Sequence, residues 1–449
     1  MKTKEELLGT EKISKLMLSM AVPSIIAQLI NILYSIIDRI YIGHIPNIGT
    51  NALTGIGLTF PIITLISAFS AFVGNGGAPL SSIALGKGDR ERAEKILGNG
   101  VFLLGVFTVL LMGFFYACQK PLLYLFGASD ATIDYATSYI SIYLIGTIFV
   151  ELSLGLNTYI IAQGQSTIAM ASILIGAVIN IVLDPIFIFV LDLDVRGAAI
   201  ATVISQACSA VWVVTFLVGK RSTLKIKVAC MKPDLHIIGS VCALGISPFV
   251  MRSTESLISI VLNRGLQKYG GDLYVGSMTV MQSVMQLLSA PLAGFTQGVQ
   301  PVISYNYGAG KYDRVRSAYK RMIAVSFAIS FVGTAATMIW PAAFAKMFTN
   351  ETDLILLVQK KMPVFMMGML FFGVQMGIQP TFLALGQAKL SLFIAMLRKV
   401  ILLVPLALVF PLWLGVDGVY IAEPVSDIVS VITASGLFWF HINKILKKE

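Results

Sequence analysis

Long apolar segments separated by short polar loops occupy almost the whole chain. A helix needs about 20 mostly apolar residues to cross a bilayer, so each such segment predicts one spanning helix. The twelve predicted helices lie at residues 15–42, 52–84, 93–118, 131–161, 167–190, 196–219, 236–266, 273–306, 314–344, 353–385, 388–413 and 416–441. Several exceed the required length, which tilting or protrusion into water would accommodate. The pattern therefore predicts an all-α polytopic membrane protein.

The charge distribution agrees with this class and adds an orientation. The chain is 56% hydrophobic and 12% charged, whereas a soluble domain carries about 25% charged residues. Its net charge of +10 does not indicate nucleic-acid binding, because the basic residues gather in alternate loops, as cytoplasmic loops do. These basic stretches are 2–15, 87–95, 220–232, 311–321 and 444–448. We therefore expect a multi-pass protein of the cell inner (plasma) membrane with both termini cytoplasmic, and no signal peptide in the charged first 15 residues.

The second half of the chain repeats the first at an offset of about 220–225 residues. Glycines, prolines and charged positions stay in step across four segments, which chance similarity between apolar stretches would not produce. The matching segments are 23–39 with 248–264, 74–90 with 296–314, 155–165 with 377–387, and 197–201 with 418–422. We expect an N-terminal six-helix lobe at 1–219, a cytoplasmic linker at 220–235 and a C-terminal six-helix lobe at 236–449. An even number of helices returns the chain to the side of the membrane from which it started. We therefore expect the two pseudo-symmetric bundles to have the same orientation and to lie around a central cleft.

One carboxylate stands in the middle of an apolar segment. Asp184 lies within residues 168–191, where an acid costs roughly 2.5–3.5 kcal/mol to insert and normally faces a partner or a cavity. Asn180 lies four residues earlier on the same helical face, and Pro185 is expected to kink the helix beside the acid. Asp38 is a second acid within a spanning segment of the first half. The alternative for both acids is that the side chain lies near a helix end and extends to water. This alternative suits Asp38 better than Asp184, which lies in the centre of its segment.

Three motifs stand out in the chain: the Leu-Gly-Lys-Gly-Asp-Arg element at 85–90, residues 180–185, and the stretch Thr296-Gln-Gly-Val-Gln-Pro-Val-Ile-Ser-Tyr-Asn-Tyr-Gly-Ala309. Together, and most of all the third, they resemble the motifs of the multidrug and toxic compound extrusion (MATE) transporters. The resemblance covers essentially the whole chain and is nearest the bacterial branch of MepA-like and DinF-like exporters. It implies a secondary active antiporter that exports cationic or amphipathic drugs in exchange for H⁺ or Na⁺, by alternating access of the two lobes. It implies no cofactor other than the coupling cation.

The same resemblance assigns a cation-coupling site to the first half. Its residues would be Asp38, Asn180, Asp184 and Thr202, with Tyr139 and Asn157 as hydrogen-bonding neighbours. Carboxylate, amide and hydroxyl oxygens suit Na⁺, and a buried carboxyl beside a like charge also suits a proton. The sequence therefore leaves the ion open. Hydrogen bonding between helices is the alternative for Asn180, Asn157 and Thr202.

The second half lacks this acid pair. The repeat places Asn263 opposite Asp38 and Val404 opposite Asp184. The site is therefore expected once, in the first half only.

Three further acids lie in apolar segments of the chain. Glu255 lies near a position where some branches of the family keep a functional glutamate, but Arg252 lies one turn before it, and a local Arg252–Glu255 ion pair is the favoured interpretation. Asp427 is another buried, titratable candidate, and Glu151 is a third; neither has an assigned role.

A substrate cavity leaves a weaker pattern. Met281, Gln282, Met285 and Gln286 form two adjacent stripes at helical spacing before Pro291. Methionine suits a surface that repacks around different molecules. Plain helix packing is the alternative.

Two other functions are weighed against export. A flippase for lipid-linked saccharides shares this superfamily, but it should line its cleft with several basic residues, and intramembrane Arg252 is nearly alone. An enzyme would need a nucleophile–base or metal-ligand constellation, and His44, His236 and His441 all lie near predicted helix ends. No Walker motif occurs, so ATP is not the expected energy source. We expect a monomer in the lipid bilayer with small organic substrates and no nucleic-acid partner.

Overall fold

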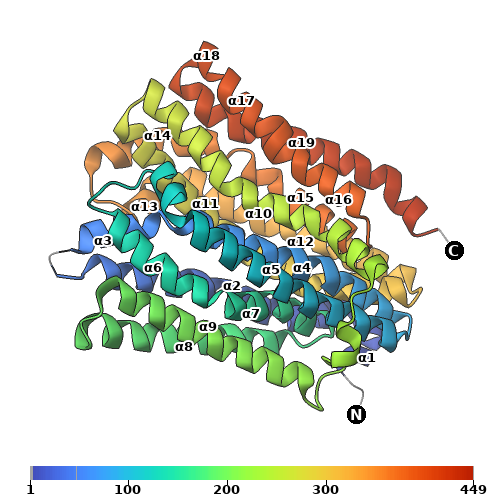
Figure 1. Ribbon diagram of the computed structural model, residues 1–449. Helices are drawn as coiled ribbons and strands as arrows, with labels where there is room; N and C mark the ends of the chain where they lie inside the picture. Colours follow the sequence, from blue (N-terminus) through green and yellow to red (C-terminus); the bar gives the residue numbers. More distant parts are fainter. Residues whose placement is uncertain (1–3, 47, 448–449) are drawn as a thin grey trace.

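Helices make up every regular element in the part of the chain that the structure describes. The computed structural model describes residues 4–46 and 48–447 (Figure 1). The helices of the first half are α1 (Lys4–Thr10), α2 (Ile13–Gly43), α3 (Gly49–Gly57), α4 (Phe60–Gly86), α5 (Arg90–Leu125), α6 (Ile133–Ile145), α7 (Thr147–Ala162), α8 (Ser166–Pro185), the π-helix η1 (Ile186–Val190) and α9 (Asp194–Val218). The following helices are the 3-10 helix η2 (Val228–Met231), α10 (Leu235–Tyr269), α11 (Asp272–Gly308), α12 (Tyr312–Ile339), α13 (Pro341–Lys346), α14 (Thr352–Met366), α15 (Met369–Ala384), α16 (Ala388–Met396), the π-helix η3 (Leu397–Leu403), α17 (Val404–Val409), α18 (Pro411–Leu414) and α19 (Val416–Ile445).

The spans agree with the apolar segments of the sequence. Among the described residues, nine helices are long and apolar enough to cross a membrane, or eleven if the bent pairs α6–α7 and α14–α15 each count as one. These pairs bend by 59° and 44°. Helix α11 has 37 residues and corresponds to the remaining predicted segment. It runs between helices of both halves, packing on α2, α4, α12 and α15.

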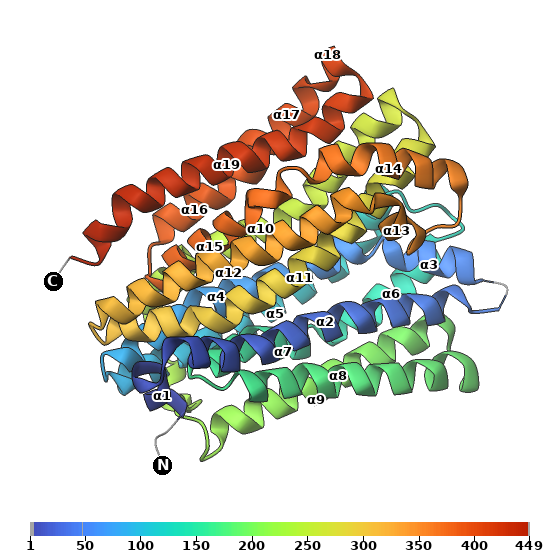
Figure 2. The same ribbon diagram turned by 180° about the vertical axis from the view of Figure 1, so that it is seen from behind.

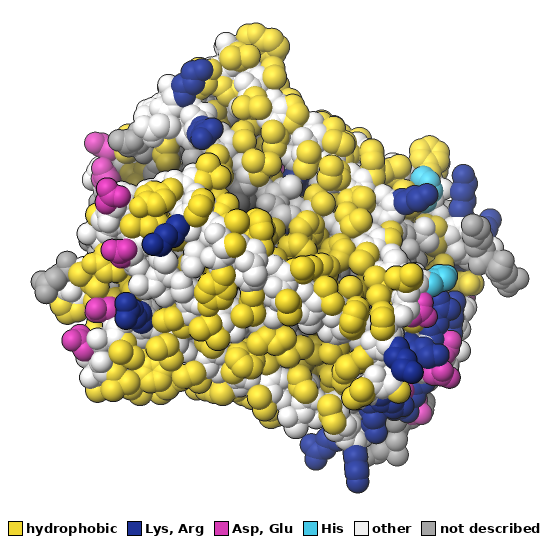
Figure 3. Space-filling view, in the orientation of Figure 1, with side chains coloured by type: hydrophobic (Ala, Val, Ile, Leu, Met, Phe, Trp, Pro, Cys, Tyr) yellow, Lys and Arg dark blue, Asp and Glu magenta, His cyan; other side chains and the backbone are white. Residues whose placement is uncertain are grey.

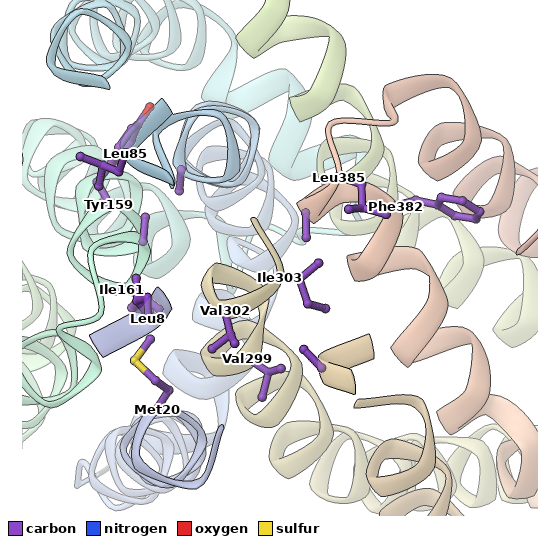
Figure 4. Close-up of a cluster of buried hydrophobic side chains, with 14 of the residues drawn as sticks. Leu8, Met20, Leu85, Tyr159, Ile161, Val299, Val302, Ile303, Phe382 and Leu385 are labelled. Carbon is purple, nitrogen blue, oxygen red and sulfur yellow. The ribbon is translucent and has the colours of Figure 1, made fainter. Parts of the chain in front are cut away.

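The two halves of the chain form two bundles that lie side by side. Figures 1 and 2 show α2–α9 on one side of the molecule and α10–α19 on the other. The halves meet where α4 packs on α10 and α11 packs on α2. A buried hydrophobic cluster crosses this contact and includes Met20, Tyr159, Val299 and Phe382 (Figure 4). Each half also has a core cluster of its own.

Helix α1, the C-terminal end of α19 and the basic loops lie at one end of the bundles (Figures 1 and 2). This end is here called the basic end, and the opposite end is called the far end. Lys and Arg side chains gather at the basic end (Figure 3). The segment between α9 and α10 is fixed there by Gln163, the residue that follows α7. Its buried Oε1 accepts from the backbone nitrogens of Thr223 at 2.7 Å and Leu224 at 3.2 Å. Helix α1 is held by the second half, because the Leu8 carbonyl accepts from Asn306 Nδ2 at 2.9 Å. The basic end is therefore closely tied together.

Two glycines let the halves touch backbone to backbone at the basic end. A Cβ atom on Gly86 would overlap the carbonyl oxygen of Tyr305, and one on Gly308 would overlap the carbonyl oxygen of Ile83. These two contacts are related by the sequence repeat, since both glycines and both carbonyls are 222 residues apart. Small residues permit this kind of close approach between helices in membranes. The ends of α4 and α11 thus form a tight joint between the halves.

We predict that Gly86→Ala or Gly308→Ala destabilises the protein by about 1–3 kcal/mol, the usual cost of forcing extra atoms into a packed contact. Gly105→Ala on α5 is the matched control, because nothing lies within 4 Å of its added Cβ. Thermal unfolding of the purified proteins in detergent measures the effect. Equal unfolding midpoints for the three variants and the parent protein would contradict a tight joint.

Candidate functional site

The structure brings Asp38 and Asp184 together inside the first half. Asp184 on α8 has an exposed fraction of 0%, and Asp38 reaches it from α2, the helix that packs along α8. The two carboxyl groups lie within hydrogen-bonding reach of each other. Ionised carboxylates only accept hydrogen bonds, so a bond between them requires a proton. The pair is therefore arranged to share one.

An amide and two hydroxyl groups surround the acids. Asn180 Nδ2 donates to Asp184 Oδ1 at 3.1 Å and approaches Thr202 Oγ1 on α9 at 3.5 Å. The Tyr139 hydroxyl on α6 approaches Thr202. Thus five of the six residues of the predicted site come together, from four different helices.

The sixth predicted residue, Asn157, lies elsewhere. Its Nδ2 donates to the Ala169 carbonyl at 3.2 Å, and its Oδ1 accepts from Ser172 Oγ at 3.3 Å. Ser172 is two helical turns before Asn180 on α8. Asn157 therefore holds α7 against α8, which is the alternative that the sequence left open for it.

Tyr34 joins the site although the sequence analysis did not select it. Its side chain interacts electrostatically with both Asp38 and Asp184. The sequence could have identified this residue, because Tyr34 precedes Asp38 by four positions and therefore lies on the same helical face.

Three buried oxygens of this cluster have no hydrogen-bond partner. They are Asp38 Oδ1, Asn180 Oδ1 and Asp184 Oδ2. Buried polar atoms are nearly always paired, so a group of unpaired ones indicates room for a bound species. Oxygen donors of this kind suit Na⁺ or a proton. Within the described residues, no three His, Cys, Asp or Glu side chains come together as a metal site.

Pro185 widens the helix beside the acids and does not break it. Helix α8 ends at Pro185 and continues directly as the π-helix Ile186–Val190, with Leu191 N donating to the Ile186 carbonyl at 2.9 Å. Proline removes the backbone donor that a regular turn would need. Single π-helical turns are frequent at functional sites.

The second half places cations beside its acids. Arg398 in η3 is 6% exposed, and its guanidinium donates to Asp427 Oδ1 at 2.5 Å and to Glu423 Oε1 at 3.1 Å. It also lies over the Phe372 ring, 4.1 Å from the centroid. The predicted buried acid Asp427 is thus part of an ion-paired cluster that links η3 to α19.

The expected local pair between Arg252 and Glu255 is wrong. Among the described residues, Glu255 forms its ion pair with Lys399 of η3. The Lys399 side chain is only 8% exposed, and a buried ammonium group needs a counter-charge more than an exposed guanidinium does. Sequence reasoning missed Arg398 and Lys399, although two adjacent cations inside an apolar segment were a visible signal.

The predicted methionine and glutamine stripes separate in the structure. Met281 lies in the core of the second half and Met285 packs against that core, while Gln282 is half-buried and Gln286 is exposed. None of the four lines the cavity that the structure shows between the halves. That cavity measures about 290 Å³, counting the solvent at its mouth, and α4, α7 and α11 form it. Its polar lining comprises Asn75, Ser82, Thr158, Gln297, Gln300 and Ser304.

We predict that Arg398→Met destabilises the protein by about 3–5 kcal/mol, because it leaves two buried carboxylates without a cation. The triple variant with Glu423→Gln and Asp427→Asn keeps the shapes but removes these charges, so it should recover much of the loss. Thermal unfolding in detergent compares the two. A triple variant no more stable than the single one would contradict this account of the cluster.

Comparison with known proteins agrees with the resemblance seen in the sequence. A family model described as MatE matches residues 23–186 and 249–409. The chain is 26% identical over 434 residues to the Multidrug export protein MepA of Staphylococcus haemolyticus (strain JCSC1435), covering 96% of this chain and 95% of that protein. It is 24% identical over 435 residues to the protein of the same name from Staphylococcus aureus (strain MSSA476), with the same coverage.

Solved structures share the fold over the whole chain. The structure titled "Crystal structure of MATE in the bent conformation" matches with a TM-score of 0.92 at 23% identity over 99% of both chains. Another, titled "Outward-facing conformation of a multidrug resistance MATE family transporter of the MOP superfamily", matches with a TM-score of 0.91 at 23% identity over 100% of both chains. With the family model covering most of both halves, this chain belongs to the MatE family.

Proposed function

We propose that this protein is a secondary active antiporter that exports cationic or amphipathic organic molecules in exchange for H⁺ or Na⁺. The observation that carries the proposal is the pair of half-buried Asp38 and buried Asp184, which has unpaired oxygens and forms no ion pair among the described residues. Export of drugs is suggested by the relatives named Multidrug export protein MepA. The protein would act as a monomer in the plasma membrane, with the basic end in the cytoplasm.

Transport would proceed by alternating access of the two halves. The glycine joint of Gly86 and Gly308 would keep the basic end shut while the far end admits the coupling ion. A cation shifts such an equilibrium only by binding one conformation more tightly than the other. A membrane potential adds roughly 2.3 kcal/mol per charge for each 100 mV, enough to bias two states of similar energy.

The π-helix after Pro185 is the proposed switch. A cation or proton at Asp184 would neutralise the acid that directly precedes the proline. The residue before a proline is biased away from the helical region, so α8 and η1 would have two arrangements of similar energy. Neutralisation would favour the arrangement that closes the space beside the acids, and the substrate would then leave.

The charges of the second half argue against a pyrophosphate-binding flippase. Arg398 and Lys399 are neutralised by Asp427, Glu423 and Glu255. Arg252 remains as an exposed intramembrane cation without an ion pair among the described residues. One such group is a poor match for two phosphates.

The function is tested by efflux from proteoliposomes with proton and sodium gradients imposed separately. Efflux of a fluorescent organic cation such as ethidium should follow one or both gradients. Efflux that follows neither gradient would contradict cation-coupled antiport.

We predict that Asp184→Asn and Asp38→Asn each abolish coupled efflux, because the amide keeps the shape but cannot exchange the ion. Residues that act as one unit are strongly non-additive, so the double variant should be little worse than either single one. Efflux rates at equal amounts of folded protein provide the measurement. Losses that multiply in the double variant would show that the two acids belong to separate sites.

For the switch, we predict that Pro185→Ala slows turnover while equilibrium binding of the organic cation survives. Alanine restores the backbone donor that a regular α-helix uses, and so it removes the reason for the π-helical turn. Binding by fluorescence and efflux from proteoliposomes separate the two effects. A normal rate, or joint loss of binding and rate, would rule out this role.

A further inference from the structure

Glu151 is a buried acid that the site described above does not use. It lies on α7 with an exposed fraction of 0%, and neither carboxyl oxygen has a hydrogen bond of normal geometry. Ser70 on α4 is the nearest hydrogen-bonding group, but its hydroxyl already donates to the Ile66 carbonyl at 3.4 Å. The carboxyl group of Glu151 is therefore free to change its hydrogen-bonding partner.

Within the part of the chain that the structure describes, no Lys or Arg side chain forms an ion pair with Glu151. Helix α4 contains no charged residue, and the charges of α9, Asp194 and Arg196, lie in its first turn at the far end. The charges of α5 lie near its two ends, and α8 contributes Asp184, a like charge. A buried carboxylate without a cation or hydrogen bonds is too costly to remain ionised. Glu151 is therefore expected to hold a proton.

Tyrosine hydroxyls connect Glu151 with the acid pair. Tyr143 on α6 interacts electrostatically with Glu151 on one side and with Tyr34 on the other. Tyr34 in turn interacts with Asp38 and Asp184. A tyrosine hydroxyl is both a donor and an acceptor, so each can accept one proton while passing on another. The groups that lie between the acid pair and Glu151 are therefore all able to take up and release a proton.

Glu151 also lies closer to the basic end than the acid pair does. It precedes Ala162, the last residue of α7, by 11 residues, whereas Asp184 follows Ser166, the first residue of α8, by 18 residues. At 1.5 Å per residue these are about 16 Å and about 27 Å. Two turns beyond Glu151, Thr158 lines the polar cavity between the halves. Glu151 thus stands between the acid pair and that cavity.

Packing does not require a carboxyl group at this position. The repeat that aligns Gly155 with Gly377 places Gly373 opposite Glu151. There, α15 packs so closely on α12 that a Cβ would overlap the Ser326 backbone. The same fold is therefore built in the second half with no side chain at all.

We propose that Glu151 is a proton relay between the Asp38–Asp184 pair and the basic end of the protein. Glu151 releases its proton to solvent that enters through the polar cavity, and the resulting carboxylate is reprotonated from the acid pair through the hydroxyls of Tyr34 and Tyr143. Each tyrosine gains and loses one proton, so the only net change is the transfer of one proton. The inference rests on the proposed antiport and on its proton-driven form.

The test uses the full-length protein in proteoliposomes, with ethidium as the transported cation and an imposed proton gradient. Glu151→Gln should slow efflux on the order of a hundredfold, the lower end of what a positioned acid or base contributes, and leave ethidium binding unchanged. Tyr143→Phe, which keeps the ring but removes the hydroxyl, should slow efflux in the same way. Glu151→Asp keeps the carboxyl group and should recover part of the rate.

Ser326→Ala is the matched control, because it removes another buried hydroxyl without a partner and should transport normally. Infrared spectroscopy provides a readout independent of transport, since the carbonyl band of a buried carboxylic acid should disappear in Glu151→Gln. A normal rate in Glu151→Gln, or an aspartate variant no better than the glutamine one, overturns the relay. Efflux by the parent protein that follows sodium alone overturns the relay but leaves the antiport standing; efflux that follows neither gradient overturns both.

Discussion

A charge inside a membrane-spanning bundle must be balanced by a partner, and this requirement governs both halves of the protein. In the second half Arg398 and Lys399 form ion pairs with three acids, so each of these acids has a basic partner within the protein. In the first half Asp38 and Asp184 face each other and form no ion pair among the described residues, although Arg39 adds a favourable electrostatic interaction with Asp38. In the proposed antiport, a proton or a cation that enters from outside supplies this balance. The proposal thus gives the second-half cluster a structural role and the first-half pair the role of responding to the ion.

The joint between the halves gives this response a mechanical consequence. Gly86 and Gly308 bring α4 and α11 into backbone contact at the basic end, and α4 and α11 also line the polar cavity. Packed interfaces of this kind change between discrete arrangements and do not deform continuously. A local change at Asp184 and the π-helix beside it is therefore suited to a change in how the halves meet.

Much of the fold and part of the site could be predicted because they depend on patterns that can be read along the sequence. Apolar length identified the spans, and the repeat identified the two halves. Asn180 and Asp184 were identified together because residues that are four positions apart on a helix lie on the same face. The partner of Glu255 could not be found in this way, because Lys399 meets it only through packing of distant helices. For the same reason a methionine stripe does not reveal whether Met281 faces a cavity or a core.

The central claim is that the coupling ion and the substrate compete through the acid pair. The most direct measurement is the affinity of the purified protein for an organic cation across a range of pH and of sodium concentration. The account predicts that affinity falls as protons or sodium ions are added, and that Asp184→Asn no longer responds. An equal response in the parent protein and in Asp184→Asn would contradict it.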